Sequence, residues 1–222
     1  MKLLTWLGTI LFPDKCILCG KLLEDGELDL CTGCRVQAPE CPVSKIKFPF
    51  IDQWTALWYY EGNVRRSLLR YKFNNRRGYA NGYGRLLAMK LLREERTDFD
   101  VLTWIPISRR RKRRRGFDQV ELIAKCVGAE LGVTPVKTLT KTRHNRQQSR
   151  IVGFAQRRAN VLGVYEPFEP QQFAGKCVLL LDDIVTTGAT ASECARILLT
   201  AGAKEVQFAV IASANHPNKN NR

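Results

Sequence analysis

The sequence has few histidines and no long apolar segment, and both features limit what the protein can be. Only two of its 222 residues are histidines. We interpret His144, which lies in a strongly basic segment, as a solvated loop residue rather than a base or a metal ligand. No apolar run approaches the roughly 20 residues that a membrane-spanning helix needs. The sequence therefore predicts no membrane span and directs the search for a site to other residue types.

The amino terminus is apolar but lacks the small-residue cleavage site of a typical secretory signal peptide. Residues 1–12 contain a single lysine, and Pro13, Asp14 and Lys15 follow directly. We expect a short helix packed against the next segment, with export as the alternative. The protein is accordingly expected to be soluble and cytoplasmic.

Acidic residues are in the minority. The chain has 21 Asp and Glu against 36 Lys and Arg, a formal net charge of +15. Such an excess favours an anionic partner, either nucleic acid, a phosphorylated metabolite or an acidic membrane surface. The hydrophobic content of 45% is enough for a full core and excludes wholesale disorder. The length fits one medium α/β domain with a small appendage.

The cysteines are clustered, with five of the eight before residue 42. Two C-x-x-C pairs, Cys16 with Cys19 and Cys31 with Cys34, are separated by eleven residues. Each pair places two thiolates on one side of a tight turn, and two pairs complete a tetrahedral site for structural Zn²⁺. A dithiol redox pair or an iron–sulfur cluster is the alternative, but an oxidoreductase would need only one pair. We treat Cys41 as lying outside the site, and we expect a reducing compartment.

The most informative stretch is residues 178–190, Val-Leu-Leu-Leu-Asp-Asp-Ile-Val-Thr-Thr-Gly-Ala-Thr. Four apolar residues, too few for a helix, predict a strand buried on both faces of a parallel sheet. A hydroxyl-rich turn and a helical pattern over about 189–199 follow. The glycine and the helix amino terminus offer unpaired N–H groups to a phosphate. The two carboxylates suit sugar hydroxyls, because ionised aspartate only accepts hydrogen bonds. The stretch therefore predicts a sugar-phosphate site at the carboxyl end of a strand.

The same stretch resembles the signature of type I phosphoribosyltransferases, which bind phosphoribosyl pyrophosphate (PRPP) with Mg²⁺. The resemblance implies that Asp182 and Asp183 bind the 2′- and 3′-hydroxyls of the ribose. It also implies that the 5′-phosphate is surrounded by Thr186, Thr187, Gly188, Ala189 and Thr190. The alternative is a strand–turn–helix unit whose aspartates only cap the turn and face solvent.

A second basic feature follows the first predicted core strand, at 101–106. Seven consecutive cations begin at residue 109 and precede a helix predicted to run from 116 to about 131. Because adjacent cations repel one another, we expect a loop that is mobile without a ligand, and we interpret it as an anion clamp rather than a nuclear-targeting tract. After residue 109, the cations of this predicted clamp are Arg110, Arg111, Lys112, Arg113, Arg114 and Arg115. The phosphoribosyltransferase resemblance assigns pyrophosphate binding to Pro106, Ile107, Ser108 and Arg109.

A third basic segment, residues 140–160, contains no acidic side chain. Its composition suits contacts with phosphate groups and a flap that closes over a site. The residues we expect to make those contacts are Arg143, Arg146 and Arg150.

The order of predicted elements alternates between strand and helix. Strands are expected at 54–60, 101–106, 133–139, 178–181 and 206–212, and helices at 64–73, 79–93, 116–131 and 189–199. This alternation predicts an α/β fold with a parallel sheet. We expect a Cys₄ zinc module at 1–45, whose folding the metal would support. A type I phosphoribosyltransferase-like domain would follow at 46–212, and a flexible tail at 213–222.

The combination resembles the ComF competence family, which joins a double-zinc-ribbon-like module to a phosphoribosyltransferase domain. The matching features are the four cysteines, Tyr60-Glu-Gly62, Leu69-Arg-Tyr-Lys-Phe73, Arg115-Gly-Phe-Asp-Gln119, Arg143 to Asn160 and the 182–190 signature. The resemblance implies a link to DNA uptake in natural transformation. Implied partners are PRPP, single-stranded DNA and a competence helicase or other DNA-uptake proteins. The basic run is longer than the family pattern needs, which suggests an additional nucleic-acid contact.

Two hypotheses follow for the function. The first is transfer of a phosphoribosyl group to an unidentified acceptor. Some base-salvage relatives have a carboxylate where Thr186 stands, so its absence leaves the catalytic residues unassigned. The second is a non-catalytic protein that senses PRPP and binds single-stranded DNA through its basic surface.

Overall fold

The computed structural model describes residues 14–43, 46–142 and 163–215 of the chain. Its centre is a four-stranded sheet in the order β1-β6-β5-β2, and every neighbouring pair is parallel. The strands are β1 (Gln53–Tyr59), β2 (Val101–Trp104), β5 (Cys177–Val185) and β6 (Glu205–Ser213). The predicted parallel α/β fold is therefore confirmed, and β5 with its two aspartates is a central strand.

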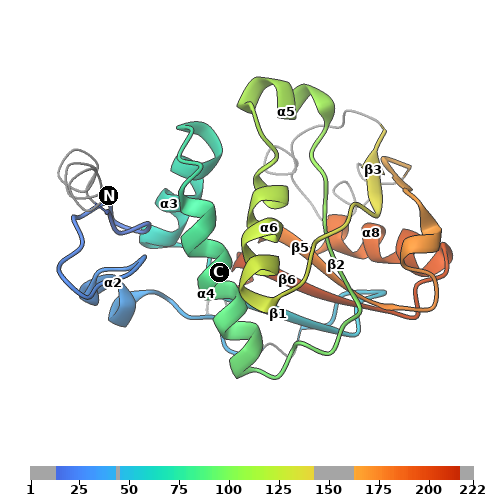
Figure 1. Cartoon of the computed structure of the whole chain (residues 1–222), viewed down its shortest axis with the longest axis horizontal. Helices are drawn as coiled ribbons and strands as arrows, with labels where there is room; N and C mark the ends of the chain where they lie inside the picture. Colours follow the sequence, from blue (N-terminus) through green and yellow to red (C-terminus); the bar gives the residue numbers. More distant parts are fainter. Residues whose placement is uncertain (1–13, 44–45, 143–162, 216–222) are drawn as a thin grey trace, which may run out of the picture.

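Helices cover both faces of the sheet (Figure 1). The sheet separates the buried apolar side chains into two clusters, one on each face. One face carries α3 (Gly62–Phe73), α4 (Tyr79–Arg93) and α6 (Gln119–Leu131). The other face carries α8 (Ala189–Thr200). Because both faces are buried, β5 and β6 are almost continuously apolar, as parallel strands require.

The cysteine-rich segment, with the short helix α2 (Thr32–Gln37), packs beside α3 and α4 (Figure 1). Ile17, Leu18 and Leu30 are buried in the same apolar cluster as these helices. Arg70 of α3 donates to the Leu18 carbonyl. The segment is thus packed into one face of the molecule, and its existence as a separate 1–45 module stays a prediction.

The strand predicted at 133–139 is wrong except at its last residue. Pro135 has no N–H to donate to a sheet, and the chain there is irregular although Val136 N–H donates to Leu102 O at 2.9 Å. Instead, β3 (Leu139–Lys141) pairs antiparallel with β4 (Tyr165–Pro167) in a separate two-stranded sheet. The 3₁₀ turn η2 (Pro170–Gln172) then leads toward β5.

The seven consecutive cations form a helix, α5 (Arg109–Arg115), where we expected a mobile loop. The Ser108 hydroxyl caps its start by accepting from the Arg111 N–H at 3.4 Å, and Gly116 ends it in the left-handed conformation at φ 77°. The helix spreads the cations around its axis, and five of the seven are exposed, which limits their repulsion.

The carboxyl-terminal tail begins later than predicted. Ser213, assigned to the tail, is instead the fully buried last residue of β6. The helix predicted over residues 1–12 lies outside the described residues, as do residues 216–222. Within the described part of the chain, no helix is long and apolar enough to cross a membrane.

Candidate functional site

A cavity of about 420 Å³ opens at the carboxyl ends of β2 and β5. Parallel α/β sheets bind their ligands at this edge, because the loops that leave the strands meet there. Three other parts of the chain complete the walls, namely α3, α5 and the β3–β4 pair. The volume lies within the range of small-molecule sites.

The two aspartates lie at the end of β5 and both line the cavity. Asp183 is buried and forms an ion pair with Lys72 of α3, with 2.9 Å between Nζ and Oδ1. The Asp182 carboxylate accepts from the Asp183 N–H at 2.8 Å. Burial, together with the negative charge of Asp183, raises the pKa of Asp182 above its ordinary value. The site therefore contains an acceptor pair that calls for hydroxyl donors or a cation.

The turn after β5 also faces the cavity. Residues 186–190, which we call the phosphate loop, all belong to its lining. Gly188 has φ 75° and caps the twelve-residue helix α8, and the Thr187 hydroxyl accepts from the Ala189 N–H at 3.5 Å. The first turn of α8 and the positive end of its dipole thus favour an anion in this turn.

Cationic side chains from three elements line the rest of the cavity. They are Arg65 and Lys72 of α3, Arg111 and Arg115 of α5, and Lys141 of β3. Among the described lining residues, only Asp182 and Asp183 carry acidic side chains. Five cations around two carboxylates leave an excess of positive charge, which suits a ligand with several negative charges.

Helix α5 divides its cations between two faces. Arg111 and Arg115 are one turn apart, half-buried, and in the cavity wall. Burial lowers the pKa of both guanidinium groups. Arg115 also lies 5.1 Å from the centre of the Phe73 ring and donates to the Gln119 side chain at 2.6 Å. The exposed face carries Arg109, Arg110, Lys112, Arg113 and Arg114.

The four predicted zinc ligands come together in the structure. The Sγ atoms of Cys16, Cys19, Cys31 and Cys34 all lie within 4.8 Å of one another. Tetrahedral zinc with Zn–S bonds of about 2.3 Å needs sulfurs roughly 3.8 Å apart, and Cys19 and Cys31 are 3.7 Å apart. The Lys21 N–H also donates to Cys19 Sγ at 3.4 Å, as in a metal knuckle. The four thiols therefore fit a metal ion, and Cys41 lies in the other apolar cluster.

Comparison with known proteins relates the segment that contains β5 and the phosphate loop to a known domain family. The phosphoribosyl transferase domain family matches residues 136–222, which include β5, the phosphate loop and α8. Competence protein F of Haemophilus influenzae is 24% identical over 225 residues, covering 91% of this chain and 98% of that protein. The resemblance to the ComF family is confirmed.

Other competence and DNA utilization proteins match over similar lengths. Competence protein ComFC of Streptococcus pneumoniae is 29% identical over 226 residues, covering 87% of this chain and 97% of that protein. The DNA utilization protein YhgH of Escherichia coli K12 is 27% identical over 218 residues, with coverages of 88% and 95%.

Two solved structures are also similar. They are the allosteric regulatory enzyme of purine biosynthesis and the glutamine PRPP amidotransferase of B. subtilis, each with a TM-score of 0.44. Their identities are 20% and 21%, and 64% of this chain is covered. The chain spans only 29% and 30% of their lengths.

Of the four residues predicted to bind pyrophosphate, only two line the cavity. Pro106 and Ile107 line the cavity, and the Ile107 N–H donates to the Asp118 carboxylate at 3.0 Å. Ser108 is buried as the cap of α5, and Arg109 is exposed, so neither is in the cavity lining. The flap residues Arg143, Arg146 and Arg150 lie outside the described residues.

Three cationic lining residues, Arg65, Lys72 and Lys141, were not assigned to the site from the sequence. Lys72 is an ion-pair partner of Asp183 with 17% of its side chain exposed. Lys141 donates to the Tyr165 hydroxyl at 2.9 Å, and burial, reinforced by the nearby Arg111, lowers the pKa of its ammonium group to about 8. The helical spacing of α3 could have suggested that Lys72 shares a face with Leu68 and Leu69, whereas nothing in the sequence pairs Lys141 with Tyr165.

Proposed function

We propose that the cavity binds PRPP and that the protein transfers its phosphoribosyl group to an acceptor. The observation that carries this proposal is the arrangement of the aspartate pair and the phosphate loop in one cavity with five cations. A sugar phosphate alone would need only the aspartate pair and the phosphate loop. The additional positive charge is accounted for by a second, multiply charged anionic group on the same ligand, such as pyrophosphate.

Each part of PRPP has a chemically matched part of the cavity. The 5′-phosphate is bound by the phosphate loop through backbone N–H groups and threonine hydroxyls. The ribose hydroxyls donate to Asp182 and Asp183, and Lys72 then moves off the Asp183 carboxylate. The pyrophosphate lies against Arg111, Arg115 and Lys141, and burial strengthens these charge–charge contacts relative to those in water.

Transfer breaks the bond between ribose C1 and the pyrophosphate oxygen, and the bonding electron pair leaves with pyrophosphate. A bond forms between C1 and an acceptor nucleophile, which gives up a proton. Arg111, Arg115 and Lys141 stabilise the charge that develops on the leaving group, while the aspartates hold the ribose and do not attack it. The carboxylate pair also fits Mg²⁺, which would neutralise charge on the pyrophosphate.

We assign the four-cysteine group a structural zinc ion. All four sulfurs are used, so no coordination position remains open for a substrate, as in structural rather than catalytic sites. The metal would support the fold of a segment that has few apolar residues of its own.

Calorimetric titration of PRPP with Mg²⁺ into the zinc-loaded protein tests the proposal. The matched control is the double variant Asp182→Asn/Asp183→Asn, which keeps side-chain size and removes the charges. We expect binding by the native protein and at least a tenfold loss in the control, because each ribose hydroxyl loses a charged acceptor. A folded, metal-loaded native protein that fails to bind PRPP would rule out the proposal.

A second candidate function is binding of single-stranded DNA, consistent with a role in DNA uptake beside a competence helicase or similar proteins. Its support is the exposed face of α5, where Arg109, Arg110, Arg113 and Arg114 point to solvent. Names of the relatives refer to competence and DNA utilization. Reversing two of these charges, Arg110→Glu with Arg113→Glu, should weaken DNA binding and flatten its salt dependence while PRPP affinity stays unchanged. An unaltered salt slope would exclude this surface.

A further inference from the structure

We infer that Phe48 is a positioning residue for the phosphate loop. It lies outside the segment that matches the phosphoribosyl transferase domain family, in the chain between α2 and β1. The inference rests on the proposed function, because it concerns how the same cavity holds the 5′-phosphate.

The Phe48 ring lies directly against the backbone of Gly188. A Cβ atom built on Gly188 would be 2.2 Å from Cδ1 and 2.4 Å from Cε1 of the ring. Real Cβ contacts are never so short, so the ring occupies the space where any other side chain would start. Gly188 is the position of left-handed φ that turns the chain from the phosphate loop into α8. Phe48 therefore supports the loop at the residue on which its conformation depends.

Phe48 is itself held firmly by the sheet. Its ring centre is 5.0 Å from that of Trp54 in β1, and only 6% of the residue is exposed. The Trp54 indole N–H donates to Ile46 O at 2.7 Å, and Ile51 N–H donates to Phe48 O at 3.2 Å. These bonds hold the backbone on both sides of Phe48, and the close packing against Trp54 limits rotation of the ring.

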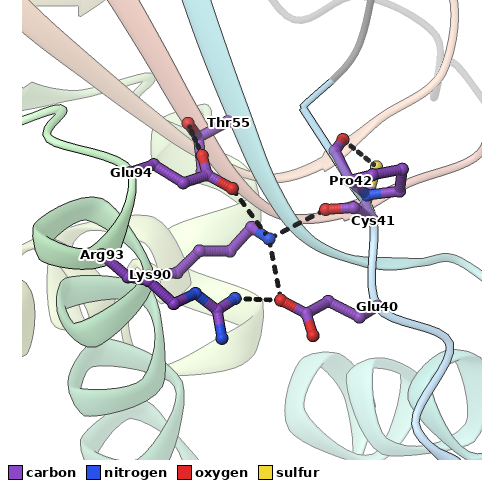
Figure 2. Close-up of polar contacts among 7 residues, drawn as sticks. All are labelled: Glu40, Cys41, Pro42, Thr55, Lys90, Arg93 and Glu94. Carbon is purple, nitrogen blue, oxygen red and sulfur yellow. Dashed lines mark hydrogen bonds and ion pairs between the residues drawn. The ribbon is translucent and has the colours of Figure 1, made fainter.

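The chain just before this segment is anchored as well. Cys41 N–H donates to Leu57 O of β1 at 3.2 Å, which places residues 39–41 along the sheet edge. Figure 2 shows the Lys90 ammonium group at the centre of this anchor, with hydrogen bonds to Cys41 O at 2.8 Å and to Glu40. Lys90 is 3% exposed and also pairs with Glu94 at 3.0 Å, so its charge is balanced by two carboxylates.

A smaller side chain at position 48 would leave a gap beneath the phosphate loop. The loop N–H groups would then have to be ordered on binding, which lowers affinity for the phosphate they hold. The pyrophosphate side of the cavity is built from α5 and β3, and Phe48 is not among the residues that line the cavity. The expected effect is therefore selective for the 5′-phosphate, which distinguishes positioning from general destabilisation.

The test compares the affinity of Phe48→Leu for ribose 5-phosphate and for pyrophosphate. We expect the Kd for ribose 5-phosphate to rise roughly tenfold and the Kd for pyrophosphate to stay unchanged. The matched control is Phe173→Leu, the same change at a fully buried position of the same apolar cluster, where both affinities should be retained. Native-like binding of ribose 5-phosphate by Phe48→Leu would overturn the inference and leave the proposed function intact. Failure of the native protein to bind either ligand would instead overturn both.

A double-mutant cycle tests the contact between Phe48 and Gly188 by a second route. Gly188→Ala places a methyl group on the Phe48 ring, and we expect it to lose ribose 5-phosphate binding. Adding Phe48→Ala removes the clash. The double variant should therefore bind ribose 5-phosphate more tightly than the sum of the two single losses predicts. Strictly additive losses in the cycle would contradict direct support of Gly188 by Phe48.

Discussion

Asp182 and Asp183 are consecutive in β5, yet they are stabilised differently. Asp183 is balanced by the Lys72 ammonium at 2.9 Å, whereas Asp182 accepts one backbone hydrogen bond and lies beside a like charge. The raised pKa of Asp182 means that its ionised form is disfavoured in the folded protein without a ligand. Binding residues are often strained in this way, since they are arranged for the ligand rather than for the empty fold.

This strain predicts how the stability of Asp182→Asn depends on pH. Because the folded pKa exceeds the unfolded value of about 3.9, the folded protein binds more protons, and its free energy of unfolding falls as pH rises between the two values. Asparagine keeps the acceptor oxygen but cannot ionise, so the variant avoids that loss. We expect it to be about 1 kcal/mol more stable than the native protein at pH 8.

Urea denaturation at pH 4 and pH 8, without ligand, measures this difference. The two proteins should have similar free energies of unfolding at pH 4, where Asp182 is largely protonated in the folded state. Equal free energies of unfolding of the two proteins at both pH values would show that the Asp182 carboxylate is not strained. PRPP binding should nevertheless be lost in the more stable variant.

Among the elements, α4 and α6 approach closely because Gly84 has no side chain. A Cβ on Gly84 would lie 2.3 Å from Cys126 Cβ and 2.9 Å from the Val127 backbone nitrogen. Neither atom can move without shifting α6. Since α4 is also packed against α3 and the cysteine-rich segment through one apolar cluster, this contact helps to fix the cavity wall.

We predict that Gly84→Ala lowers the free energy of unfolding by about 2–3 kcal/mol, because the methyl group forces the helices apart. Gly78, at the start of α4, is the matched control. A methyl group on Gly78 would meet no neighbouring group within 4 Å, and φ there is −58°, so Gly78→Ala should be neutral or slightly stabilising. Thermal unfolding of both variants measures the difference. A stable Gly84→Ala protein would mean that α6 is free to move.

Helices α4 and α5 differ in how well the sequence predicts them. Helix α4 begins and ends at Tyr79 and Arg93, the bounds predicted from the sequence. Helix α5 was not predicted, because repulsion between its seven cations favours a loop. The cap at Ser108 and the left-handed glycine at 116 nevertheless define a helix between them. Both end signals were present in the sequence, and they outweighed the repulsion once most of the cations faced solvent.

At the scale of the whole molecule, the cysteine-rich segment contributes buried side chains to the same apolar cluster as α3, α4 and α6. Ile17 and Leu18 are buried against α3, and the Asp29 carboxylate pairs with Arg85 of α4 at 2.8 Å. A loss of structure around the four thiols would therefore expose apolar surface of the larger domain.

We accordingly predict that metal removal destabilises the whole protein in one transition. Treatment with a chelator should lower the Tm by at least about 10 °C, since structural zinc contributes several kcal/mol to folding. Cys19→Ser should have a similar effect, whereas Cys177→Ser, at a half-buried thiol outside the group, should not. Calorimetry with and without chelator gives the measurement. An unchanged Tm would show that the four thiols are not a structural metal site.

The sequence by itself determined the features that depend on neighbouring residues. The run from Val178 to the helix start at Ala189 specifies strand, acidic pair, turn and helix within one continuous stretch, and the cysteine spacing specifies two knuckles. Such features can be predicted because chain connectivity already places their atoms near one another. The parallel sheet followed from the alternation of strands and helices.

Only the tertiary structure decided which distant side chains complete the site. The Lys72 ammonium group of α3 forms an ion pair with the Asp183 carboxylate at the end of β5, although the two residues are 111 positions apart in the chain. The ring of Phe48, which precedes β1 in the chain, lies against Gly188 of the phosphate loop. Arg111 and Arg115 face the cavity because α5 is helical and its rotation is set by its ends. These contacts depend on how packed elements are oriented, and no local preference of the chain encodes that orientation.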